Sequence, residues 1–399
     1  MEKKNLQKQL GLKNAPEAYL KKLSKFFDLY KKGKVSLDEL SVITELGKDK
    51  LLDYFHKTAG EEAVILVCGG AGFIGSNFVR YMLQKHPKYR IINYDKLTYA
   101  GNLDSLKDLA KNPHYKFIKG DISSEKQVES VFLKNKIDYV VNFAAETHVD
   151  RSIHGGAREF LMTNVLGVHT LLEAVKKHGI KRMIQISTDE TFGSIDLKED
   201  RHFKEDSPFA PNVPYAAAKA GGDLMCRAYF KTHKVPVMVT HCSNNYGSYQ
   251  FPEKMIPFFL YKAMAGDKLP LYGDGKNVRD WIHVDDHCVA IDKILHKGKP
   301  GEVYNIGADQ ERNNIEVARA ILKILGKKDN LITFVDDRPG HDRRYSIDTT
   351  KIHGELKWKS TKVFENTLPD VIDWYLNNQW WIDSVRNKEK GFNLHFKKS

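Results

Sequence analysis

The sequence predicts an α/β protein that consists of a doubly wound parallel sheet, a smaller C-terminal α/β domain and an appended N-terminal helical segment. Two observations predict the sheet. Short apolar runs typical of buried parallel strands, such as residues 64–68 and 183–186, alternate with stretches of helical periodicity. The run at 64–68 also leads through a glycine-rich turn into a helical pattern, which is the order of elements that a dinucleotide-binding unit requires.

Composition and charge exclude several classes of protein. The chain has 399 residues, 29% charged and 41% hydrophobic, which is ordinary for a soluble globular protein of two or more domains. No apolar run approaches the ~20 residues of a membrane helix, and the N-terminus is too polar for a secretory signal. The four cysteines lie far apart, so we expect a cytoplasmic protein with no disulfide framework and no metal site.

The net charge of +12 fits two interpretations. One is attraction to phosphate groups, and the other is a lysine-rich solvated surface. We favour the second because the 63 lysines and arginines are mostly scattered. We therefore expect no binding of nucleic acid.

Residues 1–60 are predicted to form the helical extension. Apolar residues at helical spacing predict a first helix over residues 16–32. Ser-Leu-Asp-Glu at 36–39 is typical of a capping box that opens a second helix, and a third is expected around residues 51–55. No cluster of Arg, Asn and Gln indicates a base-reading helix, so we favour an interaction or packing module with an unidentified protein partner.

The turn at residues 69–75 has glycines spaced G-x-x-G-x-x-G, at Gly69, Gly72 and Gly75. Such glycines permit a tight turn and a close approach of a pyrophosphate to the N-terminus of the next helix. The following strand ends at Asp95, where an acidic side chain can accept hydrogen bonds from the adenosine ribose. Because its charge would repel a 2′-phosphate, we expect NAD rather than NADP.

Two further strands extend this pattern. The strand that precedes Gly120 ends with Asp121, which is placed to reach the adenine. The strand at residues 139–143 ends in Ala144 and Ala145, whose small side chains would let the cofactor come close. With helices between the strands, the rhythm is that of a doubly wound sheet.

Polar residues suited to catalysis follow another buried strand. Thr188, Asp189 and Glu190 come directly after an apolar run, at the edge where open α/β sheets bind ligands. Tyr215 and Lys219 are four residues apart, so they lie on one face of a helix. Because a lysine cation stabilises tyrosinate, we expect the pKa of Tyr215 to be lowered towards that of a general base. The two neighbouring carboxyls add an acid and a base, since their repulsion raises one pKa.

Several motifs resemble those of one enzyme family. The glycine turn, Asn-Phe-Ala-Ala at 142–145 and Tyr-x-x-x-Lys at 215–219 resemble the extended short-chain dehydrogenases/reductases, which have a Rossmann fold. Within that group, five stretches are similar to motifs of dTDP-glucose 4,6-dehydratases: residues 95–102, 187–190, 252–257, 279–284 and 337–345. The resemblance covers residues 63–385 in order and leaves residues 1–60 outside it.

The resemblance implies a lyase of deoxysugar biosynthesis that uses NAD to dehydrate a nucleotide-activated glucose, with dTDP-glucose as the expected substrate. It implies that Tyr215, assisted by Lys219 and the nicotinamide charge, takes the proton of the C4 hydroxyl. Glu190 would be the base at C5, and Asp189, held protonated, would protonate the departing C6 hydroxyl. Thr188 would hydrogen-bond the C4 oxygen. A homodimer joined partly through the helix that carries Tyr215 is also implied.

Other site residues are carried over from the motifs by position. The expected NAD contacts are Gly69, Gly72, Phe73, Ile74, Gly75, Asp95, Lys96, Leu97, Thr98, Asp121, Ile122, Phe143, Ala144, Ala145, Thr147, Tyr215, Lys219 and Asn245. The expected substrate contacts are Thr147, Thr188, Asn244, Lys254, Met255, Tyr272, Arg279, Asn314, Arg338, His341 and Tyr345. Arg279 and Arg338 suit a pyrophosphate because a planar guanidinium can bind it bidentately.

We therefore expect three parts. The extension occupies residues 1–60, the NAD-binding domain residues 61–245 and the sugar-nucleotide domain mainly residues 246–399, with residues 280–308 returning to the NAD-binding domain. The tail is expected to pack as helices whose core is aromatic: Trp358, Phe364, Trp374, Trp380 and Trp381.

Three alternatives stay open. The nucleotide could be UDP or CDP instead of dTDP, because contacts to the base are not legible in a single sequence. The enzyme could be a 4-epimerase or decarboxylase of the same fold, although an epimerase needs no acid–base pair at Asp189 and Glu190. The chain could also be an NAD-binding regulator or scaffold that acts through residues 1–60, which the intact Tyr215 and Lys219 argue against.

Overall fold

The computed structural model describes residues 16–31, 37–44 and 63–388. The chain divides into two compact units, Met1–Glu62 and Ala63–Ser399. In the first unit, α2 (Glu17–Lys31) and α3 (Leu37–Thr44) confirm two of the predicted helices, and the third lies outside the described residues. The Tyr19 hydroxyl donates a 2.8 Å hydrogen bond to the Thr44 main-chain oxygen, which ties the two helices together.

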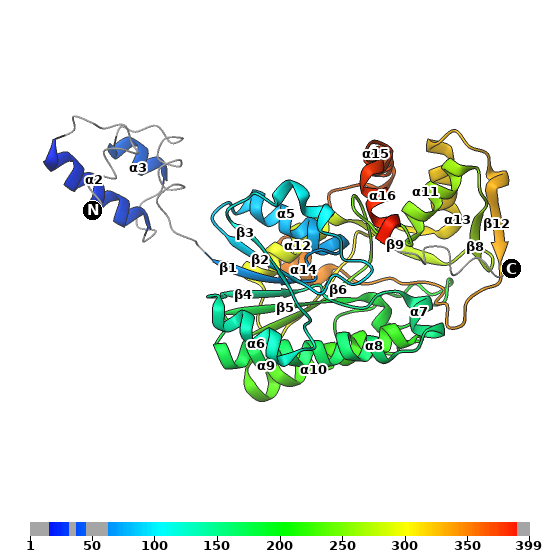
Figure 1. Ribbon diagram of the computed structural model, residues 1–399, viewed down its shortest axis with the longest axis horizontal. Coiled ribbons are helices and arrows are strands. Elements are labelled where there is room, and N and C mark those ends of the chain that lie inside the picture. The colour runs from blue at the N-terminus through cyan, green and yellow to red at the C-terminus, as the bar shows by residue number, and fades with distance from the viewer. Residues whose placement is uncertain (1–15, 32–36, 45–62, 389–399) are drawn as a thin grey trace. The chain divides into compact units, whose positions relative to one another are not determined.

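The second unit is built on a seven-stranded parallel sheet, which confirms the predicted fold class (Figure 1). Its strands are β1 (Val64–Cys68), β2 (Arg90–Asp95), β3 (Tyr115–Lys119), β4 (Tyr139–Asn142), β5 (Arg182–Thr188), β6 (Val237–Cys242) and β10 (Val303–Ile306). The spatial order is β10-β6-β5-β4-β1-β2-β3. The strand order therefore reverses between β1 and β4, and ligands bind open α/β sheets at such a switch point.

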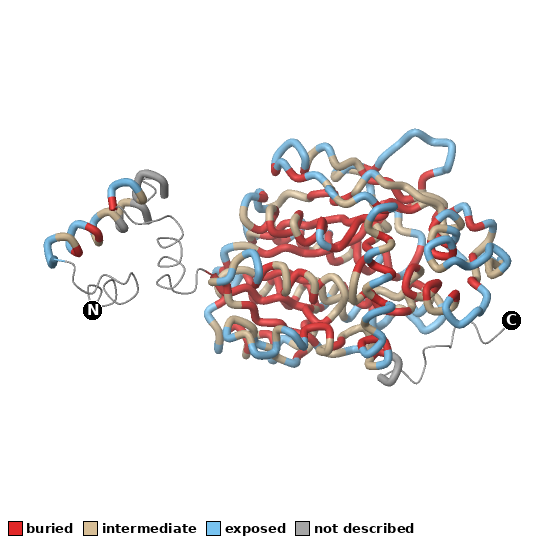
Figure 2. Tube along the Cα trace, turned by 90° about the horizontal axis from the view of Figure 1, so that it is seen from above, coloured by how far each residue is buried: buried red, intermediate tan, exposed pale blue. Residues whose placement is uncertain are grey.

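Helices cover both faces of the sheet (Figure 1). One face carries α5 (Phe73–Lys85), α12 (Val284–Lys297) and α14 (Thr350–Leu356), and the other carries α6 (Glu125–Lys134), α9 (Val168–His178) and α10 (Pro214–His233). Alternate residues of β1 serve the two faces: Ile65 packs with Phe78 of α5, whereas Leu66 packs with Leu171 of α9. Figure 2 shows the strands between these layers as buried.

Shorter strands and further helices lie beyond the carboxyl ends of the large sheet's strands (Figure 1). Two small sheets are formed by β7 (Asn244–Tyr246), β9 (Val278–His283) and β11 (Glu311–Asn313), and by β8 (Leu269–Tyr272) and β12 (Ile332–Val335). The helices are α11 (Met255–Ala265), α13 (Asn314–Ile324), α15 (Phe364–Asn377) and α16 (Gln379–Lys388). α12 and β10 belong to the layers of the large sheet; the predicted domain boundaries, including the return of residues 280–308 to the NAD-binding domain, stay a prediction.

The aromatic tail follows the predicted pattern with one exception. Trp358, Phe364 and Trp381 are buried, and Trp374 packs partly buried against the same core as Trp381. Trp380, however, is 45% exposed, and the Lys107 ammonium lies 5.6 Å from its ring centroid. The prediction that Trp380 belongs to the core is wrong, because two adjacent residues of a helix point in different directions.

Among the described residues, no helix combines the length and apolar character needed to cross a membrane.

Candidate functional site

The glycine turn after β1 is shaped by two close approaches of the backbone. Gly69 has a φ of +74°, and a Cβ there would lie 2.5 Å from the Ala144 nitrogen at the end of β4. A Cβ on Gly75 would lie 2.2 Å from the Gly69 oxygen. Both positions therefore require glycine for folding. Gly72 differs, because its φ of −78° suits any residue and its nearest neighbour would be the Gly69 oxygen at 3.4 Å.

At the end of β2, Asp95 fixes the backbone of two turns. Its Oδ2 accepts a hydrogen bond from the Ala71 nitrogen at 2.9 Å, and its Oδ1 accepts one from the Leu97 nitrogen at 2.7 Å. Burial raises the pKa of Asp95, and these two hydrogen bonds oppose the shift. Nearby, Lys96 lies 2.8 Å from Oδ2 of Asp121, and the pKa of Asp121 is lowered by hydrogen bonds to Lys96 and Ser123 that outweigh burial.

These residues line a cavity of about 80 Å³ beside the switch point. It collects the predicted cofactor residues Gly69, Gly72, Asp95, Lys96, Thr98, Asp121, Ile122, Phe143, Ala144 and Ala145. Leu97, the remaining predicted residue of this stretch, does not line this cavity. It takes a positive φ of 58° and contributes its main-chain nitrogen to Asp95.

A cavity of about 250 Å³ continues from the glycine turn to the end of β5. Sixteen predicted residues line it: Gly69, Gly72, Phe73, Ile74, Gly75, Phe143, Ala145, Thr147, Thr188, Asp189, Glu190, Tyr215, Lys219, Asn244, Asn245 and Lys254. The structure thus brings the predicted cofactor contacts and the predicted catalytic residues to one place. They come from the segments that follow β1, β4 and β5, from β7, from the start of α5, from α10 and from the N-cap of α11.

The carboxyls of Asp189 and Glu190 are placed by the 3₁₀ turn η3 (Asp189–Phe192), which follows β5 directly. Thr188 is its N-cap and accepts a 3.4 Å hydrogen bond from the Glu190 nitrogen. Asp189 is only 2% exposed, and Glu190 is partly exposed. Asp189 Oδ2 and Glu190 Oε2 are both buried and make no hydrogen bond within the described residues, so each oxygen is available to a ligand in the cavity.

The two carboxyls differ in their electrostatic surroundings. Burial raises the pKa of Asp189 well above its usual range, and the charges of Glu190 and Asp280 raise it further. Burial also raises the pKa of Glu190, but Arg338, Arg279 and Lys254 oppose this shift. The pKa values of both carboxyls are thus raised, that of Asp189 more strongly, while three cations oppose the rise at Glu190. A difference in this direction is what an acid and a base within one pair require.

Tyr215 and Lys219 begin α10 and face the same cavity. Burial and the charge of Glu190 raise the pKa of Tyr215 well above its usual range, against a hydrogen bond with Thr188 that lowers it. Lys219 donates a 2.6 Å hydrogen bond to the Ile186 main-chain oxygen, and burial lowers its pKa while Asp223 opposes this. In the chain by itself the pKa of Tyr215 is therefore raised; the predicted lowering, which also involves the nicotinamide charge, stays a prediction.

A second cavity of about 250 Å³ adjoins Glu190 on the side of the small sheets. It collects predicted substrate contacts, namely Asn244, Lys254, Met255, Tyr272, Arg279, Asn314, Arg338, His341 and Tyr345. Arg279 is held rigidly: it donates hydrogen bonds to the main-chain oxygens of Val278 and Asp342, at 2.7 and 3.0 Å, and stacks on Tyr345, 4.1 Å from the ring centroid. Arg338 is less enclosed and lies 3.4 Å from Oδ1 of Asp150.

Two acidic residues of this cavity were missed by the sequence interpretation. Asp150 contacts Arg338 and accepts a 3.3 Å hydrogen bond from the Tyr272 hydroxyl. Glu253 accepts a 3.2 Å hydrogen bond from the Tyr99 hydroxyl and lines both large cavities. A signal existed for Glu253, which stands next to Lys254 in a recognised motif, whereas nothing in the local sequence marks Asp150.

Comparison with known proteins agrees with this geometry. Residues 66–371 match the family model described as GDP-mannose 4,6-dehydratase. A dTDP-glucose 4,6-dehydratase of Xanthomonas campestris pv. campestris is 48% identical over 341 residues, which cover 81% of this chain and 96% of that protein. One from Streptomyces niveus is 47% identical, with 82% and 96% covered. The chain belongs to the dTDP-glucose 4,6-dehydratase family.

Solved structures agree with this membership. The dTDP-glucose 4,6-dehydratase of Bacillus anthracis, crystallised with NAD, is 49% identical and superposes with a TM-score of 0.76, covering 81% of this chain and 99% of that one. The UDP-glucose 4-epimerase of Thermotoga maritima also superposes, with a TM-score of 0.73, at 27% identity and with 79% and 99% covered. The fold is thus common to dehydratases and epimerases, and the residues of the site must distinguish them.

Proposed function

We propose that the protein catalyses the NAD-dependent dehydration of dTDP-glucose to its 4-keto-6-deoxy sugar. The observation that carries this proposal is the pair Asp189 and Glu190, in the cavity that holds Tyr215 and Lys219: burial raises the pKa of both carboxyls, that of Asp189 more strongly, while three cations oppose the rise at Glu190. An epimerase has no use for such a pair. Nearly full-length dTDP-glucose 4,6-dehydratases at 44–49% identity support the choice of reaction and nucleotide.

The residues around the switch point fit NAD. Gly72 is a position where the fold does not require glycine, and it lines both cavities that meet there. The glycine turn leads into the N-terminus of α5, which favours a pyrophosphate, and the Asp95 carboxylate suits ribose hydroxyls. When bound, NAD supplies a hydride acceptor and a positive charge. We propose that the predicted contacts lining the two cavities hold it.

Tyr215 serves as the base for the first step. Its phenolate takes the proton of the C4 hydroxyl as hydride leaves C4. Since burial raises the pKa of Tyr215, a positive charge nearby is needed to favour the tyrosinate, and Lys219 is the chain's own contribution. Thr188, which hydrogen-bonds Tyr215 in the structure, steadies the developing charge on the C4 oxygen.

The acid and base of the elimination are Asp189 and Glu190. Once C4 is a ketone, the C5 proton is acidified, and the Glu190 carboxylate removes it. Asp189 gives its proton to the C6 hydroxyl, which departs as water. Return of hydride to C6 and of a proton to C5 completes the reaction, so no net oxidation occurs. Arg279 and Arg338, which line the adjoining cavity with Tyr272, are proposed to hold the sugar nucleotide's diphosphate.

The test is incubation of purified protein with dTDP-glucose and with UDP-glucose separately, followed by mass spectrometry. We expect the loss of one water from dTDP-glucose without added reductant, and no loss with Glu190→Gln. Loss only from UDP-glucose would overturn the nucleotide assignment. A new hexose of unchanged mass would indicate an epimerase, and no reaction with either sugar would favour an NAD-binding regulator.

We also propose that the protein is a homodimer joined through α10. The elements packed beside its start, α8 (Arg158–Leu161) and the π-helical turn η2 (Met162–Gly167), expose apolar side chains, as does α10 itself. Leu161 and Leu224 are 53% and 54% exposed. Burying such residues between two copies is favourable. Light scattering should give twice the chain mass for the native protein and a smaller mass for the Leu161→Lys, Leu224→Lys variant.

Residues 1–60 are proposed to bind another protein. In α3 the apolar side chain of Val42 is 78% exposed, which suits a contact with a partner. The test compares the proteins captured by the full chain with those captured by residues 61–399. Equal capture by both would contradict the proposal.

The whole chain is proposed to act in the cytoplasm. Four cysteines are free thiols, as is usual in a reducing compartment: Cys68, Cys226, Cys242 and Cys288.

A further inference from the structure

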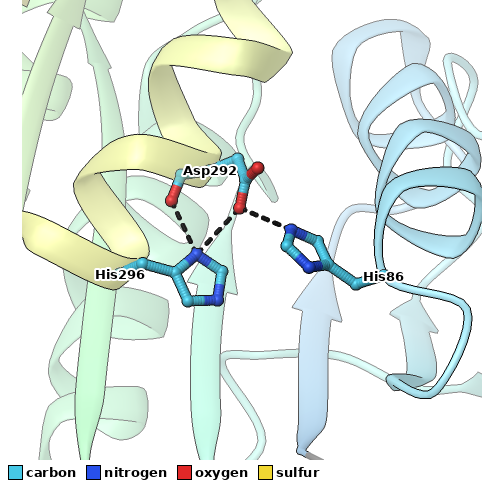
Figure 3. A group of neighbouring side chains, drawn as sticks. All are labelled: His86, Asp292 and His296. Atoms are coloured by element: carbon cyan, nitrogen blue, oxygen red, sulfur yellow. Dashed lines mark hydrogen bonds and ion pairs between the residues drawn. The ribbon is translucent and has the colours of Figure 1, made fainter. Parts of the chain in front are cut away.

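Three side chains with metal-ligating atoms meet at the far end of α5 from the glycine turn. His86 is the C-cap of α5, and Asp292 and His296 lie one turn apart on α12. In Figure 3, interactions from both imidazoles meet at one carboxylate oxygen. Asp292 Oδ1 lies 2.9 Å from His86 Nε2 and 2.8 Å from His296 Nδ1, and all three ligand atoms lie within 4.8 Å of one another.

Two of the remaining polar atoms of this cluster are also contacted. The Tyr81 hydroxyl donates a 2.9 Å hydrogen bond to Asp292 Oδ2, and the Tyr89 hydroxyl lies 2.7 Å from His296 Nε2. Metal-binding histidines and carboxylates usually have such partners on the atoms that face away from the ion, because these contacts fix the side-chain orientation and the imidazole tautomer.

We propose that His86, Asp292 and His296 bind a divalent transition-metal ion of the zinc class. Two imidazoles and one carboxylate are a ligand set that suits such ions and leaves positions for water. The cluster is open to solvent on one side, since the two histidine side chains are 23% and 27% exposed and that of Asp292 is 10% exposed. The site departs from our sequence-based expectation of no metal, which considered only cysteine spacing.

The distances between the ligand atoms fit an ion with little movement. With bonds of ~2.1 Å, adjacent ligands lie ~3.0 Å apart in an octahedron and ~3.4 Å apart in a tetrahedron. The contacts of Asp292 Oδ1 to the two histidines, 2.9 and 2.8 Å, are within about 0.2 Å of the first value and differ from the second by about half an ångström. Small rotations of the side chains would therefore admit either geometry.

A proton competes with the metal at His296. Its Nδ1 lies 2.9 Å from the Asp292 main-chain oxygen as well as 2.8 Å from Oδ1, so without metal this nitrogen donates a hydrogen bond. Metal binding replaces that proton and places the imidazole hydrogen on Nε2, where the Tyr89 oxygen can accept it. Binding of the metal would therefore release this proton. Arg182 is the cation near His296, and its guanidinium donates hydrogen bonds to the main-chain oxygens of Leu295 and Gly298, at 3.1 and 2.8 Å.

The ion would tie α5 to α12 and would not take part in the reaction. These two helices pack against each other on one face of the large sheet. His86 follows the thirteen residues of α5, so the ion would lie about 20 Å along the helix from the glycine turn. We therefore expect the metal to raise thermal stability and to leave the turnover of nucleotide sugar unchanged, which makes this proposal independent of the proposed function.

Calorimetric titration with Zn²⁺ of full-length, untagged protein, freed of metal by a chelator, tests the proposal. We expect saturable binding of one ion per chain and a rise in melting temperature with Zn²⁺. His86→Gln should abolish both effects. His178→Gln is the matched control, because His178 pairs with Glu129 alone, at 3.1 Å, and should behave as wild type. Absence of saturable binding, or equal binding by His86→Gln, would overturn the proposal.

Tyr81→Phe separates metal binding from general damage to the fold. Removing the hydroxyl leaves all three ligands in place, so affinity should fall about ten- to a hundred-fold. Its melting temperature in chelator should stay near that of wild type. An unchanged Zn²⁺ affinity in Tyr81→Phe, together with unchanged binding in His86→Gln, would place the ion elsewhere in the chain and contradict the assignment.

Discussion

Lys219 donates a hydrogen bond across 2.6 Å to the main-chain oxygen of Ile186, which ties helix α10 to the end of strand β5. This hydrogen bond holds the ammonium in the cavity that Lys219 and Tyr215 both line. Asp223, one turn further along α10, opposes the effect of burial on the pKa of Lys219. Asp223 itself accepts a 2.5 Å hydrogen bond from Ser187. Lys219 is therefore positioned by both elements of the site.

Lys219→Met should slow the first step of the reaction strongly. Loss of the only cation that α10 contributes to the cavity leaves the buried phenol of Tyr215 with its raised pKa, so we expect kcat to fall by at least about a hundred-fold. Lys231→Met, an exposed position on the same helix, serves as control. Steady-state kinetics measure kcat of both variants, and circular dichroism checks that both are folded. Full activity of Lys219→Met would contradict the proposed role.

Glu190→Gln should separate oxidation from elimination. Glutamine keeps the size of the side chain but cannot take the C5 proton, so we expect water loss to slow by about 10²–10⁴-fold. Oxidation at C4 does not need this carboxylate, so reduced cofactor should accumulate and be visible by its absorbance. Glu125→Gln, on the exposed start of α6, should react normally. Fast water loss by Glu190→Gln would move the base to another residue.

The rate of water loss should depend on pH in a bell shape. Glu190 must be ionised, so the rate falls as the pH drops through its pKa, which burial raises above the usual 4.5. Asp189 must be protonated, so the rate falls as the pH rises through its pKa, which is raised well above the usual 3.8. Asp189→Asn should be slow and should lack the alkaline fall. An alkaline fall that persists in this variant would belong to another group.

The location of the site could be predicted because it depends on chain order alone. Residues at the carboxyl ends of parallel strands must meet at one edge, so Asp95 and Glu190 could be brought together without a structure. The spacing of Tyr215 and Lys219 likewise fixed their common face. Family motifs added residues of the second large cavity, such as Arg279 and Tyr345, whose positions no local pattern predicts.

Properties that depend on burial or on distant contacts could not be predicted. The pKa of Tyr215 is raised by burial and by the charge of Glu190, and the degree of burial is not visible in a motif. Asp150 reaches Arg338 across 188 positions of sequence. Trp380 was assigned to the core because it is aromatic, yet its exposure follows from the way α16 packs. The His86–Asp292 contact spans 206 positions and has no sequence signature.

Asp286→Asn should destabilise the fold by about 1–3 kcal/mol. This buried carboxylate accepts hydrogen bonds of 2.8–2.9 Å from the Ser360 and Thr361 hydroxyls and from the Thr361 and Lys362 nitrogens. An amide group presents a donor where an acceptor is needed. The midpoint of urea unfolding makes the measurement. The adjacent Asp285→Asn is the control, since Asp285 is 54% exposed and its ion pair with Lys362 is expected to contribute no more than about 1 kcal/mol.

Gly72→Ala should leave the protein folded and weaken its binding of NAD. An alanine Cβ at this position meets nothing closer than the Gly69 oxygen at 3.4 Å, and the backbone already has a φ of −78°. The same change at Gly75 drives a Cβ to 2.2 Å from that oxygen, so Gly75→Ala should lower the melting temperature. Gly354→Ala, within α14 and with nothing within 4 Å, should affect neither property.

Comparing these three variants tests whether the glycine turn binds the cofactor. Because the fold tolerates a methyl group at Gly72, only a ligand that approaches the backbone closely gives a reason for glycine there. Fluorescence titration with NAD, alongside thermal unfolding of the three variants, makes the measurement. Unchanged NAD affinity in a fully folded Gly72→Ala would mean that the pyrophosphate does not lie against this turn, and the assignment of Gly69, Gly72 and Gly75 as cofactor contacts would then fail together.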